Sequence, residues 1–474
     1  MKRLLRVTPI AVVVLLVSTV SVGQRYISRI STRSVHRQTA GETVLGRGPQ
    51  AKDGATSPAQ VAAALPPARA GLECARGRNG GATDTGVTGA AIKLGAAVVK
   101  SGPGASFLGQ VPIALEAVVN HVNRAGGICG RLLELSMKDD KWNADDGERY
   151  IRNFIAEGVF ALAVSPSSEG LDAAIRNNDI SKAGIPVVGA DGMLISQYTN
   201  RWVFPVAAST ITAMHAMAKD AAARGAKTFG LVYEKTYHFG VEGASAFRGA
   251  LKRLFPGRDP KTVLKADEGI EVDQAPYKTA VDRFNTGCHP CDFVAMLLEP
   301  PTALQWIRDG GSFGSLDGGG TGGPQPLFVD SFARNCGTPC NGMWVWSGYH
   351  PPVAPFDDLP GVVDYVNTVR SHTSSIDVNN PFVEGGYLGM QLLVKALQAV
   401  GPDLTRARLR TALETLTLAT GLTQPLRWAS GDHFANNSVH AFSVVVNAGS
   451  FAGWRYEQTN WVTDPWPGLD APKR

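Results

Sequence analysis

Short apolar runs alternate with helix-length amphipathic segments from Ala91 onward, and the whole cycle then starts again. The first series contains AIKLGAAVV, RLLELSMK, VFALAVS, IPVVGA and WVFPVAAS. The second contains TFGLVYE, TVLKAD, DFVAMLLE and PLFVD. Segments with a helical apolar period, roughly 10–15 residues long, separate these runs. This alternation predicts parallel sheets connected by right-handed crossovers, and two series predict two α/β lobes.

The last part of the chain does not make a third series. It contains the helical segments LPGVVDYVNTVRSH, FVEGGYLGMQLLVKALQAV and RARLRTALETL, followed by the strand-like runs QPLRW, HAFSVVVN and GWRYEQTNWV. We expect these segments to complete the two lobes, so that the chain crosses between them more than once. The expected limits are 73–208 with 349–415 for the first lobe, and 209–348 with 416–474 for the second.

The first 23 residues have the pattern of a secretory signal peptide. Basic side chains at the start precede an apolar run from Ile10 to Val22, and the small residues Ser21 and Gly23 stand before a possible cleavage point. The run is short for a membrane span, and the alternative is an uncleaved N-terminal anchor. Both interpretations place the bulk of the chain outside the cytoplasm, either secreted or tethered to the outer face of the membrane.

Residues 24–72 are rich in Arg, Ser, Ala, Gly and Pro without an apolar period, which predicts a disordered basic tether. The formal net charge of the whole chain is +5. Ten Lys/Arg and two Asp/Glu fall within residues 1–72, so the remaining 36 basic and 39 acidic side chains carry a formal charge of −3. The folded part therefore has no basic footprint for nucleic acid.

The six cysteines allow three interpretations. They are Cys74, Cys129, Cys288, Cys291, Cys336 and Cys340. A redox Cys-x-x-Cys begins a helix, whose dipole lowers a thiol pKa, but here a helix precedes the CHPC motif and the strand DFVAMLL follows it. Zinc bound by the last four cysteines is a second alternative. Because an exported chain more often forms disulfides, we predict the pairs Cys288–Cys291, Cys336–Cys340 and Cys74–Cys129.

The sequence contains no recognisable catalytic constellation. GGSFG at Gly310–Gly314 fits the pattern of a nucleophile elbow, but a helix precedes it and a loop follows it. The Gly/Pro-rich segment between Gly311 and Pro326 lacks the Gly-Lys-Ser/Thr end of a phosphate-binding loop, and it is predicted to be a long surface loop. We therefore expect no enzyme activity, no cofactor and no metal site.

Six segments, taken together and in this order, carry a family resemblance: KSGPGASFLGQ, VNRAGGICGRLLELSMKDD, GIPVVGADG, FGLVYEKTYHFG, DFVAMLLEPPTALQWIRDGG and PFVEGGYLGMQLLVKAL. They resemble the leucine/isoleucine/valine-binding proteins, which are solute receptors of ABC importers. The likeness covers roughly residues 88–460. It implies a type I periplasmic-binding fold: two Rossmann-like lobes, a hinge of three crossovers and a ligand cleft between the lobes.

The resemblance also implies where the ligand contacts lie. The Ser-Gly-Pro turn contributes Ser101 and Phe107, and the serine-rich loop after VFALAV contributes Ser165, Ser167 and Ser168. Their hydroxyl and N–H groups suit a carboxylate or an amide. The alternative role of these serines is to cap the following helix.

Further candidate contacts follow other strands of the two series. They are Trp142, Asp191, Gly192, Tyr237, His238, Phe239, Glu299 and Asp330. The alternative role of Trp142 is packing at the surface or the hinge. Amino-acid receptors usually offer a hydroxyl at the position of Asp191, and a carboxylate there would repel a ligand carboxylate unless a cationic group lay between them.

The sequence thus predicts a monomeric extracytoplasmic receptor. It would capture a small polar molecule, such as an amino acid or amide, by lobe closure and deliver it to an ABC permease. A ligand-sensing receptor without transport is the alternative, and a thiol-redox or zinc protein is a weaker one.

Overall fold

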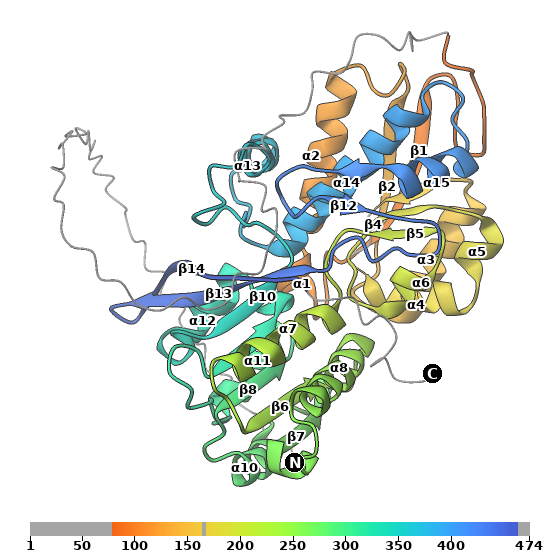
Figure 1. The fold of residues 1–474 in the computed structure, drawn as a ribbon. Coiled ribbons are helices and arrows are strands. Elements are labelled where there is room, and N and C mark those ends of the chain that lie inside the picture. Colours follow the sequence, from red (N-terminus) through yellow and green to blue (C-terminus); the bar gives the residue numbers. More distant parts are fainter. Residues whose placement is uncertain (1–77, 164–166, 463–474) are drawn as a thin grey trace, which may run out of the picture. The chain divides into compact units, whose positions relative to one another are not determined.

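The computed structural model describes residues 78–163 and 167–462 (Figure 1). Its first large sheet has five parallel strands in the order β2-β1-β3-β4-β5. The strands are β1 (Ala91–Val98), β2 (Leu132–Asp139), β3 (Ala161–Ala163), β4 (Val187–Ala190) and β5 (Val203–Pro205). We call this sheet, with the helices packed on it, lobe 1.

The second large sheet has seven strands in the order β14-β13-β10-β9-β8-β6-β7. The strands are β6 (Phe229–Glu234), β7 (Leu264–Ile270), β8 (Phe293–Leu297), β9 (Thr321–Pro324), β10 (Trp344–Ser347), β13 (Ser438–Asn447) and β14 (Ser450–Val462). Strands β6 to β10 are parallel, whereas β13 and β14 add an antiparallel edge. We call this sheet and its helices lobe 2. A separate two-stranded ribbon joins β11 (Thr417–Leu418) and β12 (Leu426–Arg427).

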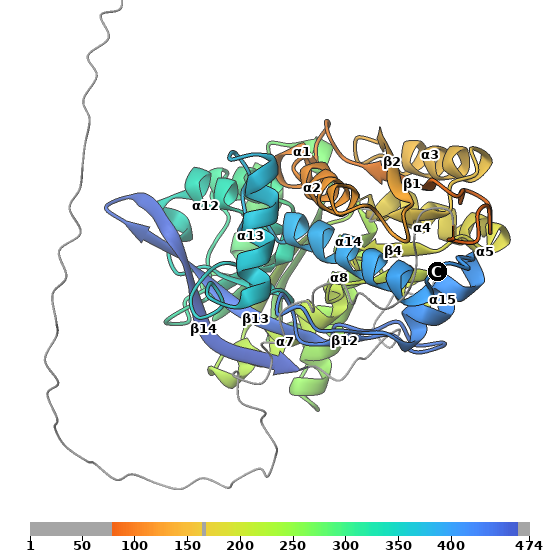
Figure 2. The ribbon, with the colours of Figure 1, turned by 90° about the horizontal axis from the view of Figure 1, so that it is seen from above.

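The helices of lobe 1 come from two distant parts of the chain. They are α1 (Ala105–Leu108), α2 (Val111–Arg124), α3 (Ala144–Ala156), α4 (Ser168–Arg176), α5 (Asp179–Ala183), α6 (Ile195–Thr199), α13 (Pro360–His372), α14 (Pro381–Val400) and α15 (Arg406–Thr415). Figure 2 shows α14 beside α2, and α14 also packs on β4. Helix α14 is buried along most of its length, which explains its nearly uniform apolar sequence.

The helices of lobe 2 are α7 (Thr210–Ala223), α8 (His238–Leu254), α9 (Pro260–Val263), α10 (Lys278–Gly287), α11 (Pro300–Arg308) and α12 (Asp330–Cys336). Short 3-10 turns lie at Val272–Gln274, Gln325–Leu327 and Thr338–Cys340. Helices α7 and α8 pack on each other, and each also contacts strands of the seven-stranded sheet. No helix in the described part of the chain is long and apolar enough to cross a membrane.

Three segments connect the lobes, as the sequence predicts: one after β5, one after β10 and one before β13. The side chain of Asn436 ties the three together. Its Nδ2 donates hydrogen bonds to the carbonyl of Val206 in the first segment, at 3.2 Å, and to that of Gly348 in the second, at 3.1 Å. Asn436 also pairs with Ala208 in an isolated parallel bridge. The fold is therefore the predicted two-lobe α/β architecture with a three-crossover hinge.

The prediction of a long surface loop between Gly311 and Pro326 is wrong at its end. Residues Thr321–Pro324 form β9, a buried strand between β8 and β10, and the strand expected at PLFVD is a 3-10 turn and a helix start instead. A Cβ on Gly322 would lie 2.3 Å from the ring of Trp346. Neighbouring side chains fill the space that glycine leaves, so this strand has no apolar signature of its own.

Two of the predicted disulfides, Cys288–Cys291 and Cys336–Cys340, are present. The first lies in the loop from α10 to β8, at the amino end of that strand, where a redox motif would have no helix start. Cys129 is also disulfide-bonded, while its expected partner Cys74 lies outside the described residues. The signal segment and the tether lie outside them as well, and the predicted limits of the two domains remain a prediction.

Candidate functional site

A small cavity lies where the carboxyl ends of the parallel strands of both lobes converge. It is lined by Phe107, Leu108, Trp142, Ser168, Asp191, Met193 and Phe382 from lobe 1, and by Phe239 and Pro326 from lobe 2. Open α/β sheets place their ligands at this edge. The cavity has a volume of about 250 Å³ and is too narrow inside to hold an organic molecule. The lobes are therefore in close contact, and an organic ligand could enter only after they separate.

Aromatic rings form most of the cavity wall. The ring of Trp142 packs edge-on against Phe107, with 5.3 Å between centroids, and Phe107 in turn contacts Phe382 at 5.6 Å. Trp142 follows β2 in a turn where both it and Lys141 have positive φ, 61° and 58°. Its backbone N–H donates to Asp140 Oδ1 at 3.0 Å, which holds this turn. Strained turns of this kind cluster at ligand sites, so the geometry supports a binding role for Trp142.

Asp191 is the one charged residue among the described lining residues. It follows β4, and the positive φ of Gly192, 71°, lets the chain turn directly behind it. Oδ1 accepts hydrogen bonds from Gln197 Nε2 at 2.7 Å and from the N–H of Met193 at 3.3 Å. Oδ2 has no hydrogen-bond partner among the described residues. Burial raises the pKa of Asp191 to about 7, although the hydrogen bonds from Gln197 and Met193 act to lower this pKa.

Two further buried acids stand at strand ends in lobe 2. Glu234 ends β6 and Glu299 follows β8, and the N–H of Glu299 donates to Glu234 Oε1 at 2.5 Å. Glu299 also caps α11 through the N–H of Thr302, at 3.0 Å. In each acid Oε2 has no partner among the described residues. Burial raises the pKa of Glu299 to about 7, and burial together with the neighbouring Glu299 carboxylate raises the pKa of Glu234 well above its usual value.

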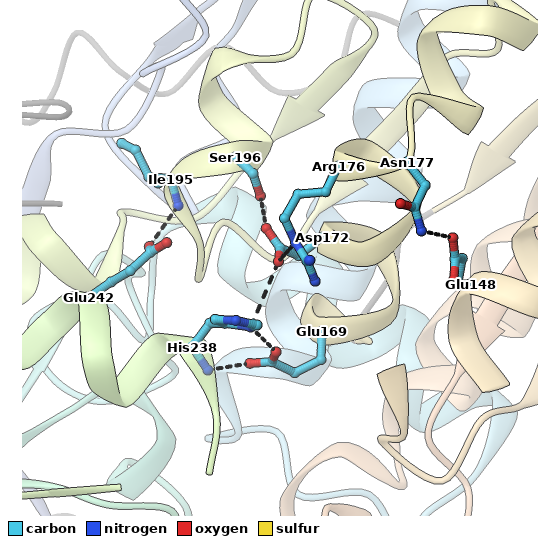
Figure 3. Close-up of polar contacts among 9 residues, drawn as sticks. All are labelled: Glu148, Glu169, Asp172, Arg176, Asn177, Ile195, Ser196, His238 and Glu242. Atoms are coloured by element: carbon cyan, nitrogen blue, oxygen red, sulfur yellow. Dashed lines mark hydrogen bonds and ion pairs between the residues drawn. The ribbon is translucent and has the colours of Figure 1, made fainter. Parts of the chain in front are cut away.

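Polar contacts between α4 and α8 join the lobes beside the cavity (Figure 3). Glu169 Oε1 accepts from the backbone N–H of His238 at 2.7 Å, and its Oε2 lies 2.5 Å from His238 Nδ1. Asp172 lies 3.7 Å from the same ring nitrogen. Close by, Glu242 of lobe 2 accepts from the N–H of Ile195 of lobe 1 at 2.9 Å. The first turn of α8 is therefore held to lobe 1 by acidic side chains.

A second polar contact between the lobes lies near the start of α12. The N–H of Asp330 donates to Asp377 Oδ2 at 3.2 Å, and Asp330 Oδ1 accepts from Asn379 Nδ2 at 3.2 Å and from Trp454 Nε1 at 2.9 Å. Burial and the nearby Asp330 raise the pKa of Asp377 to about 6. This contact does not line the cavity.

The structure brings most of the sequence-predicted residues together. Phe107, Trp142, Ser168, Asp191 and Phe239 line the cavity. Tyr237 stacks on Trp142, and His238 contacts Glu169. Ser167 is buried at the N-cap position of α4, where its side chain makes no capping hydrogen bond.

Other predicted residues lie apart from the cavity. Ser101 is exposed and donates to Asp139 Oδ2 at 2.6 Å, and Asp330 belongs to the second contact. Gly192 and Glu299 are not among the lining residues, and Ser165 lies outside the described residues. The residues that sequence reasoning missed are Leu108, Glu169, Met193, Glu234, Glu242, Pro326 and Phe382. Of these, Glu234 carries a recognisable signal, because it is an acid at the end of a strand.

The described residues contain no group of three His, Cys, Asp or Glu side chains that could hold a metal ion. The cavity wall of rings, one hydroxyl and one carboxylate suits reversible binding of a small molecule.

Comparison with known proteins identifies the family. Residues 91–450 match the model of a family described as periplasmic binding protein. No curated protein is a significant sequence match to the chain.

Solved structures show the same fold. A fatty acid ABC transporter substrate-binding protein from Thermomonospora curvata is 17% identical, with a TM-score of 0.69, over 82% of this chain and 97% of that one. A possible leucine/isoleucine/valine-binding protein from Rhodopirellula baltica is 18% identical, with a TM-score of 0.66, over 77% and 96%. An R. palustris solute-binding protein in complex with 4-hydroxybenzoate is 16% identical, with a TM-score of 0.66, over 80% and 99%.

These matches confirm the resemblance seen in the sequence, and the family implies an extracytoplasmic location. The chain belongs to the periplasmic binding protein family, with the type I fold of the leucine/isoleucine/valine-binding proteins.

Proposed function

We propose that this protein is the solute receptor of an ABC importer, which captures a small polar molecule between its lobes and presents the closed form to a permease. The observation that carries the proposal is the cavity itself. Residues of both lobes line it, and the three connecting segments form a hinge between the same two lobes. A molecule bound there touches both lobes only when they are closed, so binding favours the closed form.

The contacts between the lobes set the energetic balance of closure. In the open form, Glu169 and His238 would exchange their mutual contact for water, and the rings of Trp142 and Tyr237 would be hydrated. A ligand shifts the equilibrium only by its preference for the closed form. Asp191 and the aromatic rings provide that preference, because they are shielded from water only when the lobes meet.

The proposal includes no chemical step. The protein binds and releases its ligand unchanged, and it acts as a monomer that is secreted or tethered at the outer face of the membrane. A sensor without transport would use the same cavity and the same closure. A transport receptor and a sensor differ in one outcome: cells that lack the chain lose uptake of the ligand only if the protein serves transport.

A thermal-shift screen of the purified full chain tests the receptor function. The panel contains amino acids, amides, polyamines, urea and small aromatic acids. A ligand at 100 times its Kd should add about 2.7 kcal/mol to the free energy of unfolding. Ser168→Val in the cavity should lower the affinity for a ligand that binds there, whereas Ser101→Val at the exposed turn should leave that affinity unchanged.

Lobe closure gives a second readout, because small-angle scattering should show a smaller radius of gyration with the bound ligand. Ligands that shift the melting temperature equally in both serine variants, without compaction, would contradict binding between the lobes. Uptake of the identified ligand by cells with and without the chain then separates transport from sensing.

A further inference from the structure

We infer that the ligand is an organic cation without a carboxylate, that is, an amine or quaternary ammonium compound whose charged end contacts Asp191 and whose apolar body lies against Trp142 and Phe239. This inference rests on the proposed receptor function and names the class of its ligand. It separates this chain from receptors for zwitterionic or anionic solutes.

The described residues of the cavity wall carry charge of one sign only, which is negative. Among the described residues that line it, one is acidic, none is basic, and one, Ser168, carries a hydroxyl. Asp191 is 8% exposed, and its Oδ2 atom accepts no hydrogen bond of normal geometry within the described residues, although the nearby Ser168 hydroxyl interacts with the carboxylate. A buried carboxylate oxygen without a partner costs free energy, and a ligand that supplies a positive charge and N–H donors removes that cost.

Acidic side chains extend the negative region beyond the wall on both sides. Burial is the main cause of the raised pKa values of Asp191 and Glu234, and the Glu169 carboxylate adds to both. Glu169 therefore lies near an acid of lobe 1 and near an acid of lobe 2. Two basic groups of this region are engaged, since His238 contacts Glu169 and Arg176 pairs with Asp172 at 2.8 Å.

A ligand carboxylate would meet no countercharge in this environment. It would be desolvated beside Asp191 and repelled by it, and no described lining residue could pair with it. The hydroxyl of Ser168 offers a single donor, which is weak compensation for a buried charge. A zwitterion would be attracted to Asp191 at its ammonium end, but its carboxylate end would be desolvated without a countercharge.

The aromatic wall suits the same ligand class. Phe107, Trp142, Phe239 and Phe382 surround the cavity, and the negative faces of such rings attract ammonium groups. The indole N–H of Trp142 has no partner among the described residues. The rings also shield an aliphatic or aromatic body from water, so a cation with an apolar part makes both kinds of contact at once.

The competing explanation is that Asp191 is a protonated structural group held by Gln197. Binding by matched compounds separates the two explanations. The compounds are 3-methylbutylamine with L-leucine and 4-methylpentanoate, then 2-phenylethylamine with L-phenylalanine and 3-phenylpropionate, and finally choline. Within each of the first two sets the apolar body is the same and only the charged end changes. Titration calorimetry on the purified full chain at pH 7.5 measures their affinities.

We expect at least one cation to bind about tenfold or more tightly than the amino acid and the anion of its set. Asp191→Asn keeps the shape of the side chain and the Gln197 contact but removes the charge. It should lower the affinity for that cation at least tenfold. Asp292→Asn is the matched control: Asp292 accepts backbone N–H groups of Lys227 and Thr228 outside the cavity, and its variant should bind within about twofold of the wild type.

Three results would overturn the inference. They are tighter binding of an amino acid or an anion, an Asp191→Asn variant that is folded and binds the cation unchanged, and no binding of any of the three cations at millimolar concentration. The first of these leaves the receptor function intact, because a ligand still binds. If none of the seven compounds binds and the broader thermal-shift panel is also silent, the receptor function itself fails.

Discussion

The ring of Trp142 in lobe 1 stacks on the ring of Tyr237 in lobe 2, with centroids 4.0 Å apart and planes 21° from parallel. The two residues follow β2 and β6, so this pair spans the boundary between the lobes. Phe239 continues the stack at 6.3 Å from Trp142. The contact covers one side of the cavity and must break when the lobes separate.

Removing either ring should therefore shift the protein toward the open form. A stacked aromatic pair contributes about 0.5–1.5 kcal/mol beyond the area it buries, so Trp142→Ala and Tyr237→Ala should each weaken ligand binding by roughly two- to tenfold or more. The double variant should lose less than the two single losses combined. Calorimetry gives the affinities, and scattering without ligand should show a larger radius of gyration. Fully additive losses would mean that the rings act separately.

Asn436 should be a sensitive position in the hinge. Asn436→Ala loses two hydrogen bonds to buried carbonyl groups and should lower the free energy of unfolding by about 1–3 kcal/mol. Asn436→Asp has the same shape but turns an acceptor toward those carbonyls, so it should be the more damaging change at neutral pH. Chemical denaturation of both variants measures this order. A free energy of unfolding in Asn436→Asp equal to that of the wild type would show that the amide donor is not the important feature.

The buried acids should make stability depend on pH. Burial raises the pKa of Asp191 and of Glu299 to about 7 in the folded protein, whereas carboxyl groups in unfolded chains titrate near 4. Between these values the folded state holds protons that the unfolded state has lost. Stability from these groups is therefore complete below about pH 4 and is lost as the pH rises through about 7.

Asp191→Asn removes one of these two contributions. The variant should match the wild type near pH 4 and exceed it at pH 8, by an amount on the order of 1–3 kcal/mol in the absence of ligand. Denaturant titrations at several pH values provide the measurement. If the free energy of unfolding of the variant fell between pH 5 and 8 as steeply as that of the wild type, the raised pKa of Asp191 would be contradicted.

The CHPC disulfide should contribute to stability and not to binding. Cys288 and Cys291 lie at the amino end of β8, whereas the cavity is at the carboxyl ends of the strands. Replacing both by Ser should cost about 2 kcal/mol by the loop-entropy relation for so short a loop. Ligand affinity should remain within twofold of the wild type. A loss of binding with the fold intact would reopen a functional role for the motif.

The sequence predicted the architecture and about half of the cavity wall. Asp191 and Phe239 could be found because the family resemblance places ligand contacts in the loops after parallel strands, whose carboxyl ends meet at one edge of a sheet. Phe382 and Pro326 could not be found in this way. Phe382 comes from the first turn of α14 and Pro326 from a 3-10 turn, and only the packing of distant segments brings them to the cavity.

Strand β9 shows a different limit. Periodicity methods depend on side chains, and Gly322 and Gly323 have none. Their place in the sheet is determined by Trp346 and Leu327, which fill the space above and below them. Likewise, the contact of Glu169 with His238 joins residues 69 positions apart, and no spacing rule connects them.

The amide of Asn436 has a consequence for what such a receptor can signal. Because one side chain is bonded to two of the connecting segments and belongs to the third, no segment can bend far without the others. The relative motion of the lobes is thereby restricted toward a hinge rotation that one angle describes. A membrane partner that reads this protein would receive one quantity, the degree of closure, whatever molecule has produced it.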